Sequence, residues 1–329
     1  MLLGLGLCLF LFAVLALCLG KYPVSPMNCL KIIFNALLGK EQNADLMTVN
    51  VVLRLRLPRI LAAMFVGAAL SASGSAYQGI FNNPLVSPDF LGVSSGACIG
   101  AAAAILLGFG SVAISIMAFF GGILAVLITS AIPMILKNRS NIMLVLSGII
   151  IGSLMSSILG FLKFVADPST QLASITYWTM GSFSYIAPSN IPVMFAVLLP
   201  PMIVLILMSW WLDVLSMGEM EARALGANVR LVKAIAICCS TLLTSGSVCM
   251  AGTIGWVGLI IPHFTRMITG PSNRRMMPAA CITGAIFMLM VDTLTRIIGS
   301  NEMPVSIMTG LIGAPFFCWL LYRRRGAIG

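Results

Sequence analysis

The chain has 329 residues, of which 60% are hydrophobic and only 9% are charged, and its mean hydropathy is +1.07. A soluble domain carries about 25% charged residues because its surface faces water. This composition therefore excludes a cytosolic enzyme, a nucleic-acid-binding protein with a basic face and a disordered chain. The formal net charge of +10 needs another explanation, since basic residues in a membrane protein first report its topology.

Ten apolar segments, bounded by charges or by proline and glycine, are predicted to cross a bilayer, because a span needs about 20 mostly apolar residues. The first segment lacks a basic start, and Lys21 follows it, so we interpret it as a retained span rather than a cleavable signal peptide. The predicted fold class is all-α: a polytopic membrane protein with about ten transmembrane helices in a compact bundle, in which residues 1–329 form a single transmembrane domain. In chain order the predicted spans are 2–19, 58–78, 90–107, 112–136, 142–164, 190–211, 232–250, 253–269, 277–297 and 304–322.

Basic residues predict the orientation of these spans. An even number of spans puts both termini on one side, and the run Arg323-Arg324-Arg325 favours the cytoplasm, so both termini are predicted to be cytoplasmic. A modest majority of the basic residues then lies on the cytoplasmic side, for example in the loops around Lys137 and Arg139 and around Arg230. The main exception is the run from Arg54 to Arg59, which is basic on the outer side.

The number and spacing of the cysteines and of the single histidine do not indicate a metal site. Eight of the nine cysteines lie within apolar runs, where a thiol behaves as a small hydrophobe, and Cys29 lies in a polar segment without an evident partner. The spacings fit neither a disulfide framework nor a set of metal ligands, and His263 is the single histidine. We therefore expect no metal site.

Three segments are too polar, or too rich in turn residues, to be simple connectors. Residues 78–92 contain Pro84 and Pro88, and they fit either a tight cytoplasmic turn or a rigid constriction near the mouth of a pathway. Residues 213–228 are acidic and then basic, and they fit either a solvated helix or a helix that docks into the groove of a partner. Residues 252–275 combine several glycines with Pro262, which indicates an interrupted or kinked helix.

An ordered set of short motifs runs from about residue 50 to the C-terminus. Each motif alone is weak, but the set in this order is highly specific. It comprises Arg56-Leu-Pro-Arg59, Gly67-Ala-Ala-Leu-Ser-Ala-Ser-Gly74, Asn83-Pro-Leu85 with Pro88 and Leu91-Gly92, Met180-Gly-Ser182, Ala224-Leu-Gly226, Gly258-Leu-Ile-Ile-Pro-His263 with Arg266, Asp292 with Arg296, and Glu302-Met-Pro-Val305 followed by Gly313-Ala-Pro-Phe316. This set resembles the permease subunits of the ATP-binding-cassette (ABC) importers for iron-siderophores, haem and cobalamin.

The resemblance implies a permease subunit of a type II ABC importer in the cytoplasmic (inner) membrane of a prokaryote. The implied partners are a second permease copy in a homodimer, two cytoplasmic ATPase subunits, an extracytoplasmic substrate-binding protein and the lipid bilayer, with no nucleic acid. The implied cargo is an iron complex (a siderophore or haem) or cobalamin. The sequence has no Gly-x-x-x-x-Gly-Lys-Ser/Thr phosphate loop. The chain is therefore predicted not to be an enzyme and to bind no cofactor, while the partner ATPase uses ATP and Mg²⁺.

The resemblance also implies roles for particular positions. Docking of the binding protein would use arginines that grip carboxylates on its surface, namely Arg56, Arg59 and Arg296. A cytoplasmic gate would comprise Asn83, Pro84, Leu85, Ser140 and Asn141. The fifth span would line the pathway through Ser147, Gly148, Gly152 and Ser156. Coupling to the ATPase would use the region 213–228, with Glu219, Ala224, Leu225 and Gly226, and the loop 166–187 would hold a short outer helix.

Several alternatives remain open. Arg56 and Arg59 could snorkel at the membrane interface, and Arg296 could pair with Asp292 one turn away. A permease of the same family could carry an oxyanion such as molybdate. An ion-coupled secondary transporter would place ionisable residues at mid-membrane depth, and the best acidic candidate, Asp292, lies near an outer helix end. An intramembrane enzyme would need paired carboxylates or a histidine beside a nucleophile, and neither pattern is visible.

Overall fold

The computed structural model describes residues 1–42, 44–138, 140–298 and 302–324, and these residues form helices and no strand. Two basic residues of the topology prediction, Arg139 and Arg325, lie outside the described residues. The helices in chain order are α1 (Leu2–Cys18), α2 (Pro26–Leu37), α3 (Leu46–Asn50), η1 (Val51–Arg56), α4 (Leu57–Phe81), η2 (Pro88–Leu91), α5 (Val93–Leu106), α6 (Ser111–Ile135), α7 (Asn141–Val165), α8 (Gln171–Met180), α9 (Asn190–Leu207), α10 (Ser209–Ser216), α11 (Glu219–Ala224), α12 (Val229–Ala251), α13 (Val257–Thr269), α14 (Asn273–Ile297) and α15 (Val305–Arg324).

Every segment predicted to span the membrane overlaps a helix, but 190–211 extends from α9 into α10 and 90–107 begins in η2 before α5. Within the described residues, six helices are long and apolar enough to cross a bilayer: Leu46–Phe81, Ser111–Ile135, Asn141–Val165, Asn190–Leu207, Val229–Ala251 and Asn273–Ile297. The helices α1, α5 and α13 are shorter, at 17, 14 and 13 residues. The protein is an all-α, multi-pass membrane protein, whereas the count of ten crossing helices stays a prediction.

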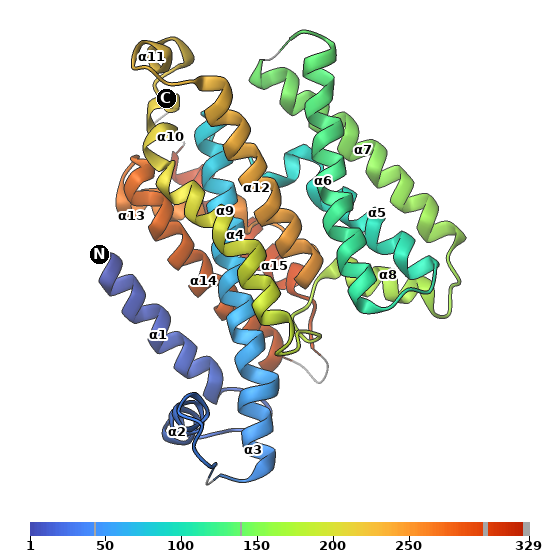
Figure 1. The fold of residues 1–329 in the computed structure, drawn as a ribbon, viewed down its shortest axis with the longest axis vertical. Coiled ribbons are helices and arrows are strands. Elements are labelled where there is room, and N and C mark those ends of the chain that lie inside the picture. Colours follow the sequence, from blue (N-terminus) through green and yellow to red (C-terminus); the bar gives the residue numbers. More distant parts are fainter. Residues whose placement is uncertain (43, 139, 299–301, 325–329) are drawn as a thin grey trace.

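The helices fall into two groups that lie side by side (Figure 1). The first group contains α5, α6, α7 and α8, and the second contains α1 to α4 and α9 to α15. The helix α12 joins the groups, because it packs against α4 and α9 on one side and against α5 and α6 on the other. The helix α4 is central, because 83% of an apolar stretch of 18 residues in the continuous helix Leu46–Phe81 is buried. Only 22% of the corresponding stretch of α7 is buried.

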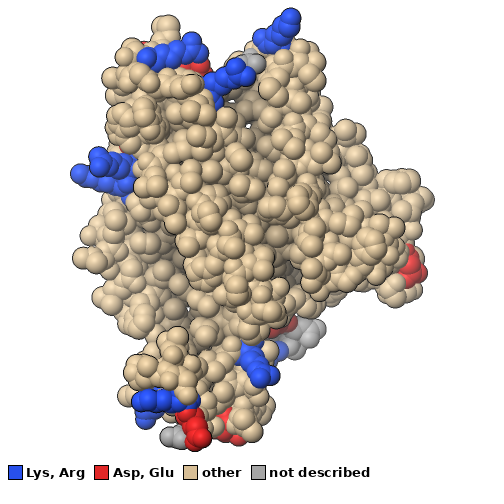
Figure 2. Space-filling model, in the orientation of Figure 1, with Lys and Arg blue, Asp and Glu red and all other residues tan. Residues whose placement is uncertain are grey.

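Figure 1 also separates two ends of the molecule. The α11 end, which is predicted to be cytoplasmic, contains α10, α11 and the first turns of α7 and α12. The α2 end, which is predicted to be the outer end, contains α2 and α3. On the face drawn in Figure 2, most lysine, arginine, aspartate and glutamate side chains lie near these two ends, and the broad surface between them is uncharged except at its left and right edges. An uncharged surface of this kind is typical of one that faces lipid.

Small residues allow the central helices to pack backbone against backbone. A Cβ added at Gly67 of α4 would collide with the backbone of Gly284 of α14, and one at Gly74 would collide with Gly258 of α13. Close approach of this kind replaces hydrophobic burial as the source of helix association in lipid. The glycines of α7 serve this purpose only in part, because Gly148 packs against the Phe90 carbonyl oxygen whereas Gly152 and Gly160 face open space.

At the α2 end, Cys29 contacts Cys18, so the expectation that Cys29 has no partner is wrong. Cys29 is fully buried in a small core with Leu17, Ile32 and Ile60, and its Sγ lies 3.9 Å from the Sγ of Cys18. Burial raises the pKa of the Cys29 thiol to about 11. Since these cysteines lie 11 positions apart across the turn from α1 to α2, the fold rather than the spacing brings them together.

Candidate functional site

The segment between α4 and α5 is not a simple cytoplasmic turn. The helix α4 ends at Asn82, which has a left-handed φ of 48°, and the Asn83 side-chain oxygen then accepts a hydrogen bond from the Leu85 backbone N–H at 2.9 Å. The chain turns back along α7, so that η2 lies against Gly148, where a Cβ would collide with the Phe90 carbonyl oxygen. Gly148 is seven residues into α7, or about 10 Å along it. The segment therefore re-enters the bundle from the α11 end.

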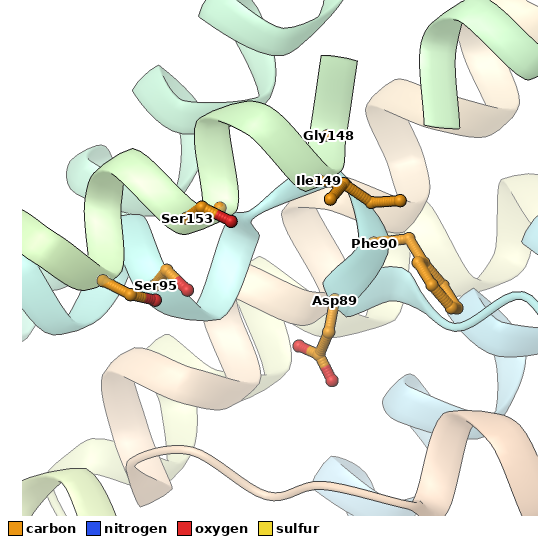
Figure 3. Close-up of a pocket in the computed structure, with 8 residues that line it drawn as sticks. Asp89, Phe90, Ser95, Gly148, Ile149 and Ser153 are labelled. Atoms are coloured by element: carbon orange, nitrogen blue, oxygen red, sulfur yellow. The ribbon is translucent and has the colours of Figure 1, made fainter. Parts of the chain in front are cut away.

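A cavity of about 430 Å³ lies between this re-entrant segment and α7. It is open to the surface, and it is located near the midpoint of α7. Figure 3 shows Asp89 and Phe90 on the η2 side and Ile149 and Ser153 on α7, with Ser95 of α5 nearby. The complete lining is Asp89, Phe90, Ser95, Gly148, Ile149, Gly152, Ser153 and Ser156.

Three of the four residues predicted to line a pathway are at this cavity, namely Gly148, Gly152 and Ser156. The fourth, Ser147, is buried, and its hydroxyl donates to the Met143 carbonyl one turn earlier. The sequence analysis missed Asp89, Phe90, Ser95, Ile149 and Ser153. Asp89 is the single charged residue in the segment 78–92, and this was the available signal for it.

Asp89 is held by hydroxyl groups. Its carboxylate accepts a hydrogen bond from Ser94 through one oxygen and from Ser87, at 3.4 Å, through the other. No lysine or arginine is among the eight lining residues, all of which lie in the described part of the chain. The cavity therefore offers hydroxyl groups, one carboxyl group and apolar surface, and no positive charge to a molecule that enters it.

The residues predicted to form a cytoplasmic gate lie together at the α11 end. Ser140 caps the start of α7 by accepting a hydrogen bond from the Met143 N–H at 3.2 Å. The Asn141 side-chain amide donates to the Ile80 carbonyl of α4 at 3.3 Å, which holds the start of α7 beside the end of α4. Leu85 is 47% exposed at this end of the re-entrant segment.

The region predicted to couple to an ATPase folds as α10 and α11. The short helix α11 ends where Gly226 adopts φ +82°, a left-handed conformation that glycine tolerates without strain. The side chains of Met217, Met220 and Leu225 are 67%, 80% and 57% exposed. An apolar surface of this kind at a predicted cytoplasmic end is typical of a helix that docks into a partner.

Asp213 of α10 fixes this region to α14, which the sequence analysis did not foresee. Its carboxylate accepts hydrogen bonds from the Ser272 hydroxyl at 2.9 Å and from the Asn273 and Arg274 backbone N–H groups at 2.5 and 3.3 Å. A carboxylate at the start of a helix satisfies unpaired N–H groups and interacts favourably with the helix dipole.

At the α2 end, the arginines that were predicted to dock a binding protein are buried within the chain. Arg56 donates to the carbonyl oxygens of Leu17, Cys18 and Tyr22 at 2.6, 3.3 and 2.5 Å. Arg296 donates to the Ala16 carbonyl oxygen at 3.2 Å. Both arginines therefore satisfy carbonyl groups at the C-terminal end of α1, where such groups lack intrahelical partners.

Arg59 and Arg296 also share one buried carboxylate. Arg59 Nε lies 2.8 Å from Asp292 Oδ1, and Arg296 Nε lies 3.3 Å from Asp292 Oδ2. The Arg59 Nη1 atom further contacts Glu302 Oε2 at 2.8 Å. We call Arg59, Asp292, Arg296 and Glu302 the outer charge cluster. The alternative in which Arg296 pairs with Asp292 is present in the structure, and docking through Arg56, Arg59 and Arg296 stays a prediction.

Glu302 is the exposed member of the outer charge cluster, with 43% of its side chain accessible. Partial burial raises the pKa of its carboxyl group, but hydrogen bonds from Ser184 and the charge of Arg59 outweigh this effect and hold the pKa below its usual range. Its contribution to stability is therefore complete at neutral pH and is lost only as the pH falls through this depressed pKa.

The sequence model of the FecCD transport family matches residues 8–323. The chain belongs to this family. It is 38% identical to the molybdate import permease MolB of Haemophilus influenzae, over 99% of this chain and 96% of that protein. It is 36% identical to an iron chelatin transport permease of Helicobacter pylori, over 98% of both chains. A solved metal-chelate type ABC transporter in an inward-facing conformation aligns over 98% of both chains with a TM-score of 0.88 and 36% identity.

FecCD membership identifies this protein as a permease of an ABC importer. A transport role agrees with the structure, since a polar cavity borders α7 and the helix α11 is exposed at one end of the bundle. The chain is a transport subunit, as the sequence analysis predicted.

Proposed function

We propose that this permease conducts an iron complex, delivered by an extracytoplasmic binding protein, across the cytoplasmic membrane of a prokaryote. The observation that carries this proposal is the lining of the cavity at the midpoint of α7, which contains hydroxyl groups and a carboxyl group but no basic residue. An oxyanion at this depth would lie beside the Asp89 carboxyl group and would meet no compensating positive charge, which disfavours its passage. A bulky chelate that carries little net negative charge meets no such penalty.

The second candidate cargo is an oxyanion, because a relative with 38% identity is named for molybdate import. Relatives named for different cargoes match this chain almost equally well, at 38% and 36%. Overall similarity therefore does not choose between them, and the lining of the cavity is the more direct indicator.

The proposed assembly contains a second permease copy and two cytoplasmic ATPase subunits. The helix α7 supports the first partner, because it is largely uncovered in one chain and yet carries the exposed serines Ser153, Ser156 and Ser157 near its midpoint. The exposed apolar side chains of α11 support the second partner. The ATPase would use ATP and Mg²⁺, and this chain would bind no cofactor of its own.

Reconstituted transport tests the proposal. The permease would be assembled in vesicles with the ATPase and the binding protein of its own system, and ATP-dependent uptake of radioactive iron–siderophore, haem and molybdate would be compared. We expect an iron complex to accumulate and molybdate to remain outside. Preferential uptake of molybdate would overturn the assignment of the cargo, and uptake without the ATPase would overturn the assignment of the mechanism.

A further inference from the structure

A single lysine connects the region predicted to couple to the ATPase with the gate. Lys233, in the first turns of α12, places its Nζ atom 2.5 Å from Glu219 Oε1 of α11 and 2.8 Å from Asn141 Oδ1 of α7. Its side chain is only 17% exposed. The sequence analysis treated Lys233 as one of several cytoplasmic charges, because neither contact is local in sequence.

The contact with Asn141 continues into the gate. The Asn141 amide uses both of its ends, since Oδ1 accepts from Lys233 while Nδ2 donates to the Ile80 carbonyl. The reverse orientation would place an NH₂ group against an ammonium group, so the two contacts fix the side chain in one orientation. The chain of contacts therefore runs from α11 through α12 and the start of α7 to the end of α4, three residues before Asn83.

These contacts also cross the boundary between the two groups of helices in Figure 1. The helix α7 packs mainly on α5, α6 and η2, which belong to its own group or to the re-entrant segment. Within the described part of the chain, the hydrogen bonds and ion pair of Lys233 and Asn141 connect the start of α7 to α12, α11 and α4. A displacement of α11 is thus applied directly to the helix that borders the cavity.

We propose that Lys233 is the positioning residue that transmits movement of α11 to the start of α7 and to the gate. This inference rests on the proposed function, since it requires an ATPase that moves α11. A lysine suits the role because its long stem is packed while its three donors hold two acceptors on different helices. Loss of the ammonium group would leave α11 free to follow the ATPase while α7 stays in place.

The experiment measures cargo imported per ATP hydrolysed, in vesicles that contain the complete transporter. We expect Lys233→Met to lower this ratio about 2-fold to 30-fold, the range expected for a residue that couples two sites. Lys233→Arg keeps the charge and the reach, and it should restore most of the ratio. The matched control is Arg230→Met, which removes the same charge from an exposed position one turn earlier in α12 and should leave the ratio unchanged.

Two further measurements make the outcome decisive. Co-purification of the ATPase with the Lys233→Met permease should remain normal, because the role is transmission; loss of the ATPase would overturn the proposal in favour of a docking role. The double variant Lys233→Met/Asn141→Leu should be no more uncoupled than the more severe single variant. An unchanged ratio in Lys233→Met would also overturn the inference. If the unmodified transporter itself fails to couple ATP to import, the proposed function fails instead.

Discussion

The two ends of the molecule use their charges in different ways. At the α2 end, Asp292 is completely buried between two arginines, and the ion pairs of the outer charge cluster are all made between groups of the same chain. At the α11 end, Lys233 is partly covered and its carboxylate partner Glu219 is 47% exposed. Buried ion pairs resist rearrangement because a separated charge has no water to solvate it, whereas exposed pairs exchange easily. The ion pairs of the α2 end should therefore keep one arrangement, whereas the side chains of the α11 end can rearrange at low cost.

The largest expected effect is on the outer charge cluster. Asp292→Asn leaves Arg59 and Arg296 without their shared carboxylate, and we expect the free energy of unfolding to fall by about 3–5 kcal/mol. Thermal unfolding of the purified permease in detergent measures this change. The control is Asp45→Asn, an exposed acidic residue at the same end, which should change stability by less than about 0.5 kcal/mol. Equal effects of the two variants would show that the cluster does not stabilise the fold.

A smaller effect is expected at the end of α1. Arg56→Met removes the donors that satisfy the carbonyl oxygens of Leu17, Cys18 and Tyr22, and we expect a loss of about 2 kcal/mol. Because the contacts are local, residues 18–25 should become more accessible to hydrogen exchange than the rest of the α2 end. Arg54→Met, at an exposed position on the same turn, is the control. Protection of residues 18–25 that survives in Arg56→Met would contradict the capping role.

At the α11 end, we expect a substitution to change stability little and coupling strongly. Lys233→Met removes a partly exposed pair, so its effect on the free energy of unfolding should be at most about 1 kcal/mol. This effect on stability, measured by the same thermal unfolding, should be several times smaller than that of Asp292→Asn, although its effect on coupling is large. A destabilisation equal to that of Asp292→Asn would remove the distinction between the two ends.

The smallest effect is expected for the exposed pair within α11. Arg223 lies 3.6 Å from Glu219 one turn away, with 70% of its side chain accessible. Arg223→Ala should therefore change the free energy of unfolding by no more than about 0.5 kcal/mol, and 0.5 M NaCl should remove most of that difference by screening. A larger change that resists salt would place Arg223 in a contact that its exposure does not suggest.

Much of the architecture follows from local patterns in the sequence. The predicted spans were apolar runs bounded by charges, prolines or glycines, and each of them overlaps a helix. This pattern is informative because a chain that crosses a bilayer needs long apolar helices. The family resemblance, rather than a local pattern, led to three residues of the cavity, Gly148, Gly152 and Ser156. Gly226 predicted a helix end by its conformational freedom alone, and it adopts the left-handed conformation after α11.

The rest depends on contacts that no local pattern contains. Arg59 and Asp292 are separated by 233 positions, and Lys233 and Asn141 by 92. Residues 78–92 were interpreted as a cytoplasmic loop that forms either a tight turn or a rigid constriction, and their inward course was not predicted, because a short polar connector looks the same whether it lies in water or re-enters a bundle. The burial of Arg56 depends on carbonyl groups at the end of α1, which are present in every helix and so leave no trace in the sequence.

The re-entrant segment has a consequence for the electrical barrier of the membrane. Its backbone is largely non-helical, and such backbone is tolerated at membrane depth only where protein or water satisfies its polar groups. Because the cavity is open to the surface and is lined by Asp89 and three serines, hydration should extend from the α11 end to about the midpoint of α7. Most of the membrane potential would then fall across the remaining half of the bundle. A charged cargo would experience that voltage as one steep step on the α2 side.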